Sequence, residues 1–336
     1  MAKRLGTHTI ELESKPHILS NAAVVGRKEG EGPLSDEFDF INEDTTMGEE
    51  TWEKAESTIL KKAVSAVLEK TGLKASDIQT IFSGDLLNQC IGSSFGIRDF
   101  GIPFVGVYGA CSTMALSLCM ASLAIESGAY KRALAATSSH FCSAEKQFRY
   151  PLEYGGQRPP SAQWTVTGAG AAILEKSVGS PYIDAIHIGT IQDLGIKDGN
   201  NMGAAMAPAA KKTISDFLKD TQTKPDDYDL ILTGDLGDVG SRLLHELLMK
   251  DCNIDISPVH NDCGLMIYNL KAQDVHSGGS GCGCSASVLC SKILNGFRKG
   301  EYKKVMFVAT GALMSPVSSL QGESIPGIAH GVIIKA

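Results

Sequence analysis

Part of this sequence occurs twice. Residues 59–86 and residues 209–236 align without a gap at an offset of 150, and both segments end in Gly-Asp-Leu. Residues 128–132 match residues 300–304 at an offset of 172, and an apolar run follows each of them. Such units are too long, and two of them are too few, for a solenoid of stacked repeats. The repetition therefore predicts two similar halves packed around a pseudo-twofold axis.

Within each half, segments with helical spacing alternate with short apolar runs. In the first half, residues 52–68 have the spacing of an amphipathic helix, and 78–83 and 102–108 are apolar runs typical of buried strands. Residues 112–127 are apolar on nearly every face, which predicts a helix in the middle of the protein. The second half predicts helices at 210–220, 239–250 and 285–298 and strands at 229–233, 256–260, 305–310 and 331–335.

This alternation favours a layered, mainly parallel α/β architecture. We divide it into an N-terminal half, 1–177, and a C-terminal half, 178–336, as two expected units of one duplicated fold.

The charge and the cysteine count argue against several classes of protein. The formal net charge is −7 and no dense Lys/Arg stripe is present, so we expect no binding to nucleic acid. Nine cysteines are an odd count and several lie in apolar stretches, which favours reduced thiols over a disulfide framework or a zinc site. The start of the chain is polar and no apolar run reaches the roughly 18 residues of a membrane span. We expect a cytoplasmic-type soluble chain without a cofactor.

Cys111 stands where a predicted strand gives way to the predicted central helix. Unpaired backbone N–H groups and the helix dipole at such a turn stabilise a thiolate, so Cys111 is a candidate nucleophile. The alternative is that Cys111 is a small apolar residue packed in a tight turn. The local sequence leaves both interpretations open.

The residues around Cys111 carry a family resemblance. Gly-Ala-Cys-Ser-Thr-Met-Ala at 109–115, with the apolar helix after it, resembles the nucleophile region of the thiolase superfamily, and 165–172 resembles its Gly-Asp-Gly-Ala-Gly-Ala-Ala strand. The resemblance implies a thiolase-like fold: two βαβαβαββ halves related by a pseudo-twofold axis, in five layers and usually dimeric. The N-terminal half would carry Cys111, and the C-terminal half Asp235 and the Gly-rich loop 278–285.

The other catalytic positions of that superfamily are altered. Where condensing enzymes have a His in Pro-His-Gln-Ala-Asn, this chain has Asp235, and where they have an Asn in a Gly-rich loop it has Cys282. An ionised carboxylate about 4 Å from a developing oxyanion would repel it by about 4 kcal/mol at an effective dielectric near 20. Loss of one oxyanion donor costs roughly 10²–10³ in rate. We therefore predict that Cys111 is vestigial and that the chain is not an enzyme.

Histidines elsewhere leave this prediction open. His140 and His260 follow predicted strands, and His330 lies in a Gly-rich segment. Each could line the pocket or be a structural histidine. The alternatives are a transferase or thioesterase that uses Cys111 with acyl-thioesters, or a scaffold without a pocket that docks to membrane partners.

Further motifs narrow the resemblance. The segments 83–89, 108–114, 153–160, 232–237, 279–286 and 326–331 together resemble the stage V sporulation protein AD family of spore-forming Firmicutes. The resemblance implies binding of dipicolinic acid, the pyridine-2,6-dicarboxylate that accumulates with Ca²⁺ in the spore core, for uptake into the developing spore. It also implies membrane-embedded partners from the same sporulation locus and a peripheral place on the forespore or spore inner membrane.

A small planar dianion needs cations or N–H donors and an apolar slot. Helix N-termini at Cys111-Ser112 and in the loop that holds Cys282 and Cys284 are candidate donors. Candidates for pairing with carboxylates are Arg149 and Arg158, or these are ordinary surface charges. Trp164 or Tyr154 could stack on the ring, or serve in packing.

Two carboxylates occupy equivalent places in the repeat, Asp85 and Asp235. They would repel the free dianion, whereas hard oxygen ligands suit calcium. We expect that they favour the calcium chelate, so that a metal ion would reach them only as part of the bound ligand.

Overall fold

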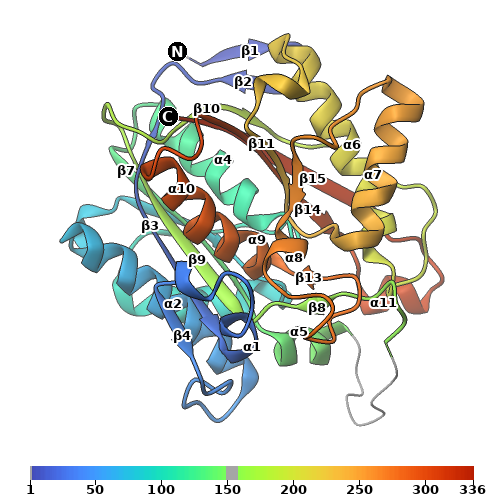
Figure 1. Cartoon of the computed structure of the whole chain (residues 1–336). Coiled ribbons are helices and arrows are strands. Elements are labelled where there is room, and N and C mark those ends of the chain that lie inside the picture. The colour runs from blue at the N-terminus through green and yellow to red at the C-terminus, as the bar shows by residue number, and fades with distance from the viewer. Residues whose placement is uncertain (1, 149–157) are drawn as a thin grey trace.

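The computed structural model describes residues 2–148 and 158–336. Its centre is a sheet of two matched sets of five strands (Figure 1). The N-terminal half supplies, in spatial order, β3 (His17–Gly26), β9 (Gly168–Glu175), β7 (Arg132–Ser139), β5 (Thr80–Gly84) and β6 (Phe104–Gly106). The C-terminal half supplies β10 (Tyr182–His187), β15 (Gly327–Lys335), β14 (Lys304–Ala312), β11 (Leu230–Thr233) and β12 (His260–Asp262).

The two sets have the same pairing pattern. In each, the first three strands pair antiparallel and the last three pair parallel. β3 and β10 join the sets through the single residue pair His17–Tyr182. The expectation of a mainly parallel sheet therefore holds for strand direction in each set: four strands run the same way, and only β9 or β15 runs antiparallel between its two neighbours.

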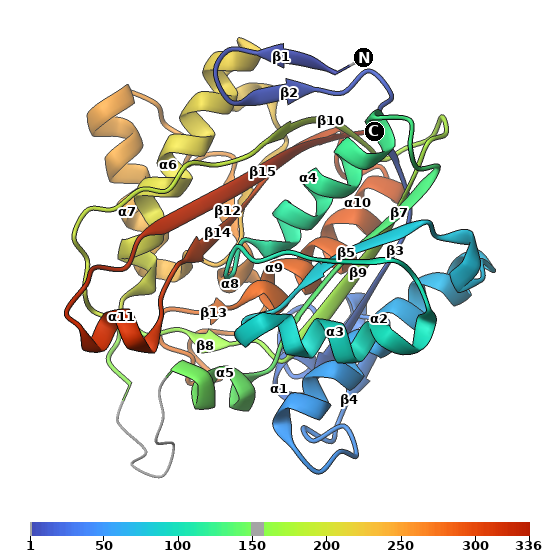
Figure 2. The ribbon, with the colours of Figure 1, turned by 180° about the vertical axis from the view of Figure 1, so that it is seen from behind.

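Helices form the other layers (Figure 2). The outer face of the N-terminal sheet carries α2 (Trp52–Thr71) and α3 (Ile91–Ile97), and that of the C-terminal sheet carries α6 (Met202–Thr221) and α7 (Gly237–Cys252). Between the sheets lie α4 (Thr113–Glu126), α9 (Cys282–Val288), the π-helical turn Leu289–Ile293 and α10 (Leu294–Arg298). These are the five layers expected of a thiolase-like fold.

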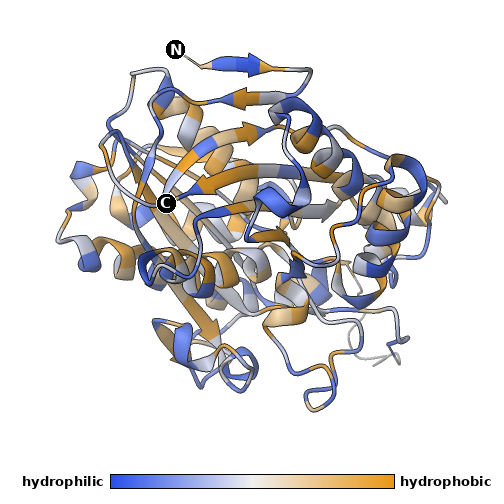
Figure 3. Ribbon diagram, turned by 45° about the horizontal axis from the view of Figure 1, so that its top comes forward, coloured by the Kyte–Doolittle hydropathy of each residue, from blue (hydrophilic) through white to orange (hydrophobic). Residues whose placement is uncertain are grey.

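Local sequence explains where the helices begin and end. Thr51 Oγ1 caps α2 by accepting from the Lys54 amide, and Gly72 ends it in the left-handed conformation that glycine adopts without strain. α4 has no polar face and its Met114, Leu118 and Ile125 are fully buried, as predicted for a central helix. Figure 3 shows how buried and exposed elements differ, with apolar colour along the central strands and polar colour on the outer helices.

The described residues also form several shorter elements. They are β1 (Lys3–Leu5), β2 (Thr9–Glu11), α1 (Arg27–Gly30), β4 (Phe40–Asn42), α5 (Phe141–Phe148), β8 (Trp164–Thr165), α8 (Cys263–Met266), β13 (Gly279–Ser280) and α11 (Pro316–Leu320). Among the described residues, 3₁₀ turns lie at Ser35–Glu37, Ala75–Asp77, Asn88–Cys90, Arg98–Phe100 and Pro225–Asp227.

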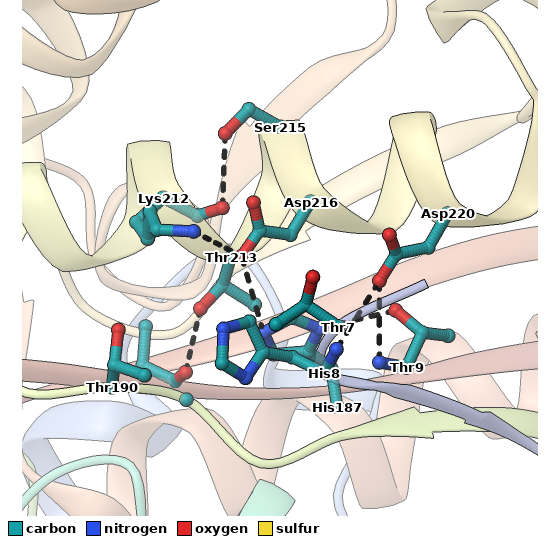
Figure 4. A network of polar contacts seen from close by, with 12 residues as sticks. Thr7, His8, Thr9, His187, Thr190, Lys212, Thr213, Ser215, Asp216 and Asp220 are labelled. Atoms are coloured by element: carbon teal, nitrogen blue, oxygen red, sulfur yellow. Dashed lines mark hydrogen bonds and ion pairs between the residues drawn. The ribbon is translucent and has the colours of Figure 1, made fainter. Parts of the chain in front are cut away.

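The N-terminal hairpin β1–β2 is fastened to α6 by a polar network (Figure 4). Asp220 on α6 accepts from the backbone amides of His8 and Thr9, and the Thr9 hydroxyl lies 3.2 Å from Nδ1 of the buried His187. One turn earlier Lys212 pairs with Asp216 at 2.5 Å. β2 also pairs antiparallel with β10, so the hairpin extends the C-terminal sheet.

Two strands differ from their predictions. The run 102–108 forms only the three-residue strand β6, whose Phe104 and Val105 are 38% and 42% exposed, because β6 is the outermost strand and pairs on one side only. The strand predicted at 256–260 lies at His260–Asp262 instead. Pro258 has no N–H to donate to a ladder, so pairing with β11 starts after it.

Candidate functional site

Cys111 lies in a tight turn between β6 and α4. The turn places Ala110 in the left-handed region at φ 49°, a conformation that costs a residue with a Cβ some strain. Hydroxyl groups hold it: Ser112 Oγ donates to the Gly109 carbonyl at 2.6 Å and Thr113 Oγ1 donates to the Ala110 carbonyl at 2.6 Å. Ser112 thus stabilises the turn and does not line the pocket in front of Cys111.

The carboxyl group of Asp235 lies beside the Cys111 thiol and is surrounded by donors. Its Oδ1 accepts from Thr310 Oγ1 at 2.8 Å, and its Oδ2 accepts from the Gly281 amide at 2.8 Å and from Ser280 Oγ at 3.1 Å. The Cys111 thiol is a further donor to it, and Cys111 Sγ lies 4.0 Å from Ser280 Oγ. Asp235 therefore holds together the Cys111 turn, the Gly-rich loop and β14.

Burial controls the ionisation of this pair. It raises the pKa of Asp235 to about 6, although the hydrogen bonds from Gly281, Cys111, Thr310 and Ser280 act in the opposite direction. Burial, and then the charge of Asp235, raise the pKa of the Cys111 thiol well above its ordinary value. At neutral pH, Cys111 is thus a thiol that donates to Asp235, and a thiol is a poor nucleophile.

The cavity in front of Cys111 is small and mostly apolar. It measures about 30 Å³, which is room for one or two water molecules, whereas sites for small ligands measure roughly 300–1,000 Å³. Its described lining contains no charged side chain and no histidine: Leu86, Tyr108, Ala110, Cys111, Ala144, Phe148, Thr165, Met202, Ser280, Ala312 and Met314. A ligand larger than water needs movement of these side chains.

The two cysteines of the Gly-rich loop have different surroundings. Cys282 packs with Cys111, Leu86 and Ala144 in one apolar cluster, and its thiol donates to the Ser138 carbonyl at 2.9 Å. Cys284 lies on the other side of the loop, near Gly279 and the buried Cys263. Burial raises the pKa of both thiols well above the ordinary value. Of these two cysteines, only Cys282 packs in the cluster that contains Cys111.

Asp85 is buried outside the cavity lining. Its carboxylate accepts from the amides of Leu87 and Ser93 at 2.8 and 2.7 Å and from Ser93 Oγ at 2.7 Å. The fully buried Glu56 of α2 lies next to it and is hydrogen-bonded to Ser143 and Ser138. Burial, and then the charge of Asp85, raise the pKa of Glu56 well above its ordinary value. We did not predict Glu56, although its place on the apolar face of the predicted helix 52–68 was a signal.

The other predicted residues that the structure describes do not line the cavity in front of Cys111. His140 Nε2 is 2.8 Å from the Thr45 carbonyl, its Nδ1 accepts from the Cys142 amide, and it does not line the cavity. Trp164 stacks on Phe141 with ring centroids 3.9 Å apart. Arg158 lies over the Trp164 ring and donates to the Asp274 carbonyl at 3.0 Å. Arg149 and Tyr154 fall outside the described residues.

Carboxylates and thiols do not gather into a metal centre in the described ranges 2–148 and 158–336. No group of three or more His, Cys, Asp or Glu side chains there could hold a metal ion. Asp85 and Asp235 are each engaged by donors of their own surroundings. In the same ranges, no helix combines the length and the apolar character that crossing a bilayer requires.

Comparison with known proteins decides the family. A family model for stage V sporulation protein AD matches residues 6–335. This chain belongs to the stage V sporulation protein AD family. The stage V sporulation protein AD of Bacillus subtilis (strain 168) is 44% identical over 333 residues, which cover 99% of this chain and 98% of that protein. The family resemblance stated from the motifs is therefore confirmed.

Solved structures show that this family has the fold of condensing enzymes. The 3-oxoacyl-[acyl-carrier-protein] synthase III of Aquifex aeolicus superposes with a TM-score of 0.56 at 13% identity, over 96% of this chain and 100% of the enzyme. An OleA variant of Xanthomonas campestris superposes with a TM-score of 0.57 at 12% identity, over 99% and 100%. At such identities the likeness establishes the thiolase-like fold of this sporulation protein and not its chemistry.

Proposed function

We propose that this protein is a non-catalytic, thiolase-like protein that binds dipicolinic acid for uptake into the developing spore. The main observation that supports the loss of catalysis is the pairing of Asp235 with Cys111. A condensing enzyme needs a thiolate and neutral donors for the oxyanion, and here a thiol donates to a buried carboxyl group. The ligand itself is inferred from membership of the stage V sporulation protein AD family.

The second altered position supports the same conclusion. A donor at residue 282 would have to point at the reacting oxygen beside Cys111, but the Cys282 thiol donates to the Ser138 carbonyl. The Gly281 amide, another donor near Cys111, is engaged by Asp235. Both of these donors are thus already satisfied inside the protein.

The lining of the cavity favours the calcium chelate over the free acid. Dipicolinate alone carries two negative charges, whereas its one-to-one complex with Ca²⁺ is neutral. The described lining offers aromatic rings from Tyr108 and Phe148 and no cation, and the charge of Asp235 lies behind it. Because burying an unpaired charge is costly, the neutral chelate is the form that such a slot accepts. Met202 and Met314 are adaptable side chains whose rotation enlarges the slot.

Equilibrium binding of dipicolinic acid to the full-length protein, with Ca²⁺ and with a chelator, tests the proposal. We expect saturable binding in Ca²⁺ and a loss of about tenfold or more in Ala312→Leu, because the added side chain fills the slot. Ala272→Leu, at an exposed position, is the matched control and should bind as the native protein does. Equally tight binding in chelator would contradict the preference for the chelate.

Absence of binding in both conditions would overturn the proposed ligand. A scaffold role or acyl transfer by Cys111 would then remain. Mass spectrometry after incubation with an acyl-thioester separates these two, since only a transferase or thioesterase gains a covalent acyl group on Cys111.

The partners that we propose are inferred from the same family membership. We propose that the protein acts peripherally at the forespore or spore inner membrane with membrane-embedded proteins of its sporulation locus. We also propose a homodimer formed along β6, whose free edge is surrounded by exposed apolar side chains of Ile91, Phe95, Phe104, Val105 and Tyr108. An open strand edge with apolar side chains is a ready template for pairing with another chain.

A further inference from the structure

A continuous line of hydrogen bonds runs from helix α7 into the interior of the C-terminal half. His245 Nε2 on α7 lies 2.9 Å from His260 Nδ1, and His260 Nε2 lies 2.9 Å from Thr233 Oγ1. Thr233 Oγ1 lies 2.6 Å from Asp262 Oδ2. His245 is half-buried, whereas Asp262 is fully buried, so the line leads from the surface region of α7 to the interior. None of these four residues has a role in the function proposed above.

The single hydroxyl hydrogen of Thr233 fixes the direction of the whole line. When Asp262 is ionised, Thr233 donates to Asp262 and must accept from His260. His260 then carries its hydrogen on Nε2, and its Nδ1 accepts from His245 Nε2. Every bond therefore points from His245 toward Asp262.

Protonation of Asp262 reverses each bond. Asp262 Oδ2 then donates to Thr233, Thr233 donates to His260 Nε2, and His260 carries its hydrogen on Nδ1 and donates to His245 Nε2. Asp262 Oδ1 keeps its two acceptor contacts, the amides of Gly237 and Gly264, each at 3.0 Å, and the protonated Oδ2 keeps a lone pair for the Leu236 amide at 2.8 Å. Both directions satisfy the same four residues without any change of heavy-atom positions.

We propose that His245, His260 and Thr233 form a proton relay that connects the surface region of α7 with the carboxyl group of Asp262. A proton binds to Nδ1 of His245 from solvent, and the hydrogen on His245 Nε2 passes to His260 Nδ1. The hydrogen on His260 Nε2 passes to Thr233, and the hydroxyl hydrogen of Thr233 passes to Asp262. One proton enters, one carboxylate becomes a carboxylic acid, and both imidazoles end neutral in the other tautomer.

The relay ends directly behind the Cys111 site. Asp262 accepts from the Leu236 amide at 2.8 Å, one residue after Asp235. The charge of Asp235 helps to raise the pKa of Asp262, so by reciprocity a neutral Asp262 eases ionisation of Asp235. The ionisable groups that face the relay are Asp235 from the β11–α7 turn, Cys263 from α8, Cys284 from α9 and Asp255 near His245.

The ionisation properties of the members fit such a relay. Burial, with Asp235 as a further cause, raises the pKa of Asp262 to about 7, so this carboxyl group exchanges a proton near neutral pH. Burial and the neighbouring His245 lower the pKa of His260 to about 3, so His260 stays neutral and conducts by changing tautomer. Below about pH 7 the hydrogen should thus lie on His260 Nδ1, and above it on Nε2.

The N-terminal half provides a matched control. Ser83 aligns with Thr233 in the repeat, and its buried hydroxyl has no hydrogen-bond partner among the described residues. Removal of this hydroxyl should leave the relay untouched.

¹⁵N NMR of the histidine-labelled full-length protein, without ligand, follows the tautomer of His260 during a pH titration. We expect the hydrogen to move from Nε2 to Nδ1 as the pH falls through about 7, and Ser83→Ala to behave like the native protein. Thr233→Val keeps the side-chain volume and breaks the line, so its His260 tautomer should no longer follow the pH. Asp262→Asn places an amide donor toward Thr233 and should hold His260 in the Nδ1–H form at every pH.

A tautomer that stays fixed through the titration of the native protein would overturn the relay. So would a tautomer that still switches at the same pH in Thr233→Val, a variant that answers the question even where Asp262→Asn fails to fold. Because no ligand is used, the outcome is independent of whether dipicolinic acid binds.

Discussion

Asp85 and Asp235 occupy the same place in the two halves, yet they serve different purposes. Each follows a buried strand in a Gly-Asp-Leu motif. Asp85 binds backbone and hydroxyl donors of the segment that follows it, whereas Asp235 binds Ser280, Gly281 and Thr310 from other elements. The same strand-end carboxylate is a local cap in one half and a link between elements in the other.

The difference arises from which carboxylate accepts the free backbone amides at the start of the segment that follows each strand. In the C-terminal half, α7 begins at Gly237, and Asp262 of the neighbouring strand accepts from the amides of Leu236 and Gly237. Asp235 is therefore released for the Cys111 site. In the N-terminal half, Asp85 itself accepts from Leu87 and Ser93. A duplicated aspartate is thus available for the site only where another carboxylate accepts the backbone amides that follow its strand.

The largest expected effect concerns Asp262, which accepts these amides in the C-terminal half. Asp262→Ala removes the acceptor for the Thr233 hydroxyl and for three backbone amides, and each orphaned buried donor costs about 1–3 kcal/mol. We expect a loss of about 3–5 kcal/mol in the free energy of unfolding, measured with urea. Asp36→Ala, at an exposed position, should change it by less than about 0.5 kcal/mol. Similar small losses in both variants would contradict the role of Asp262.

The outermost strands differ as well, and this difference is expected to matter for assembly. β6 exposes Phe104 and Val105, whereas the equivalent β12 has His260, Asn261 and Asp262. Val105→Lys places like charges against each other across a twofold edge, so we expect the dimer to weaken by about a hundredfold or more in analytical ultracentrifugation. Asn261→Lys, on the exposed part of β12, should leave dissociation unchanged. A native protein that sediments as a monomer would refute the dimer.

The two aspartates should also differ in their effect on Cys111. Asp235→Asn removes the negative charge that helps to raise the pKa of the thiol. We expect alkylation of Cys111 by iodoacetamide at mildly alkaline pH to accelerate about tenfold or more, since each pKa unit is a factor of ten in thiolate. Asp85→Asn is the control and should leave the rate unchanged. Equal acceleration in both variants would contradict the specific pairing of Asp235 with Cys111.

A smaller effect is expected at Glu56, the buried partner of Asp85. Its pKa is higher in the folded protein than in the unfolded chain, so the folded state binds the extra proton and stability falls as the pH rises above about 4.5. Glu56→Gln removes this dependence, and we expect it to gain on the order of 1 kcal/mol relative to the native protein as the pH rises. Thermal unfolding at several pH values measures the gain. A gain of the same size in Glu246→Gln, on the exposed face of α7, would assign it to general charge effects.

Much of the fold could be predicted from periodicity and from the repeat, because these report burial directly. The apolar segment 112–127 gave the central helix, and the matched segments gave two sets of strands with equal order. β6 was misjudged because an apolar run looks the same whether it is covered by the protein's own core or left open at an edge.

The candidate site was harder to predict. The motifs led to Cys111, Asp235 and Cys282, since strand ends and Gly-rich turns are visible in a sequence. Thr310 could not be selected, because its hydroxyl reaches Asp235 across 75 residues of sequence. The stacking of Trp164 on Phe141 likewise depends on side-chain directions that spacing does not define.

The way in which the two sheets meet has a consequence for how the protein unfolds. β3 and β10 touch through one residue pair, whereas α4, α9 and α10 lie in a single core that receives side chains from both sheets. Neither half can cover its inner face alone. The duplicated halves are therefore not independent folding units: the chain should lose both in one cooperative transition, and a half expressed alone should expose the whole middle layer to water.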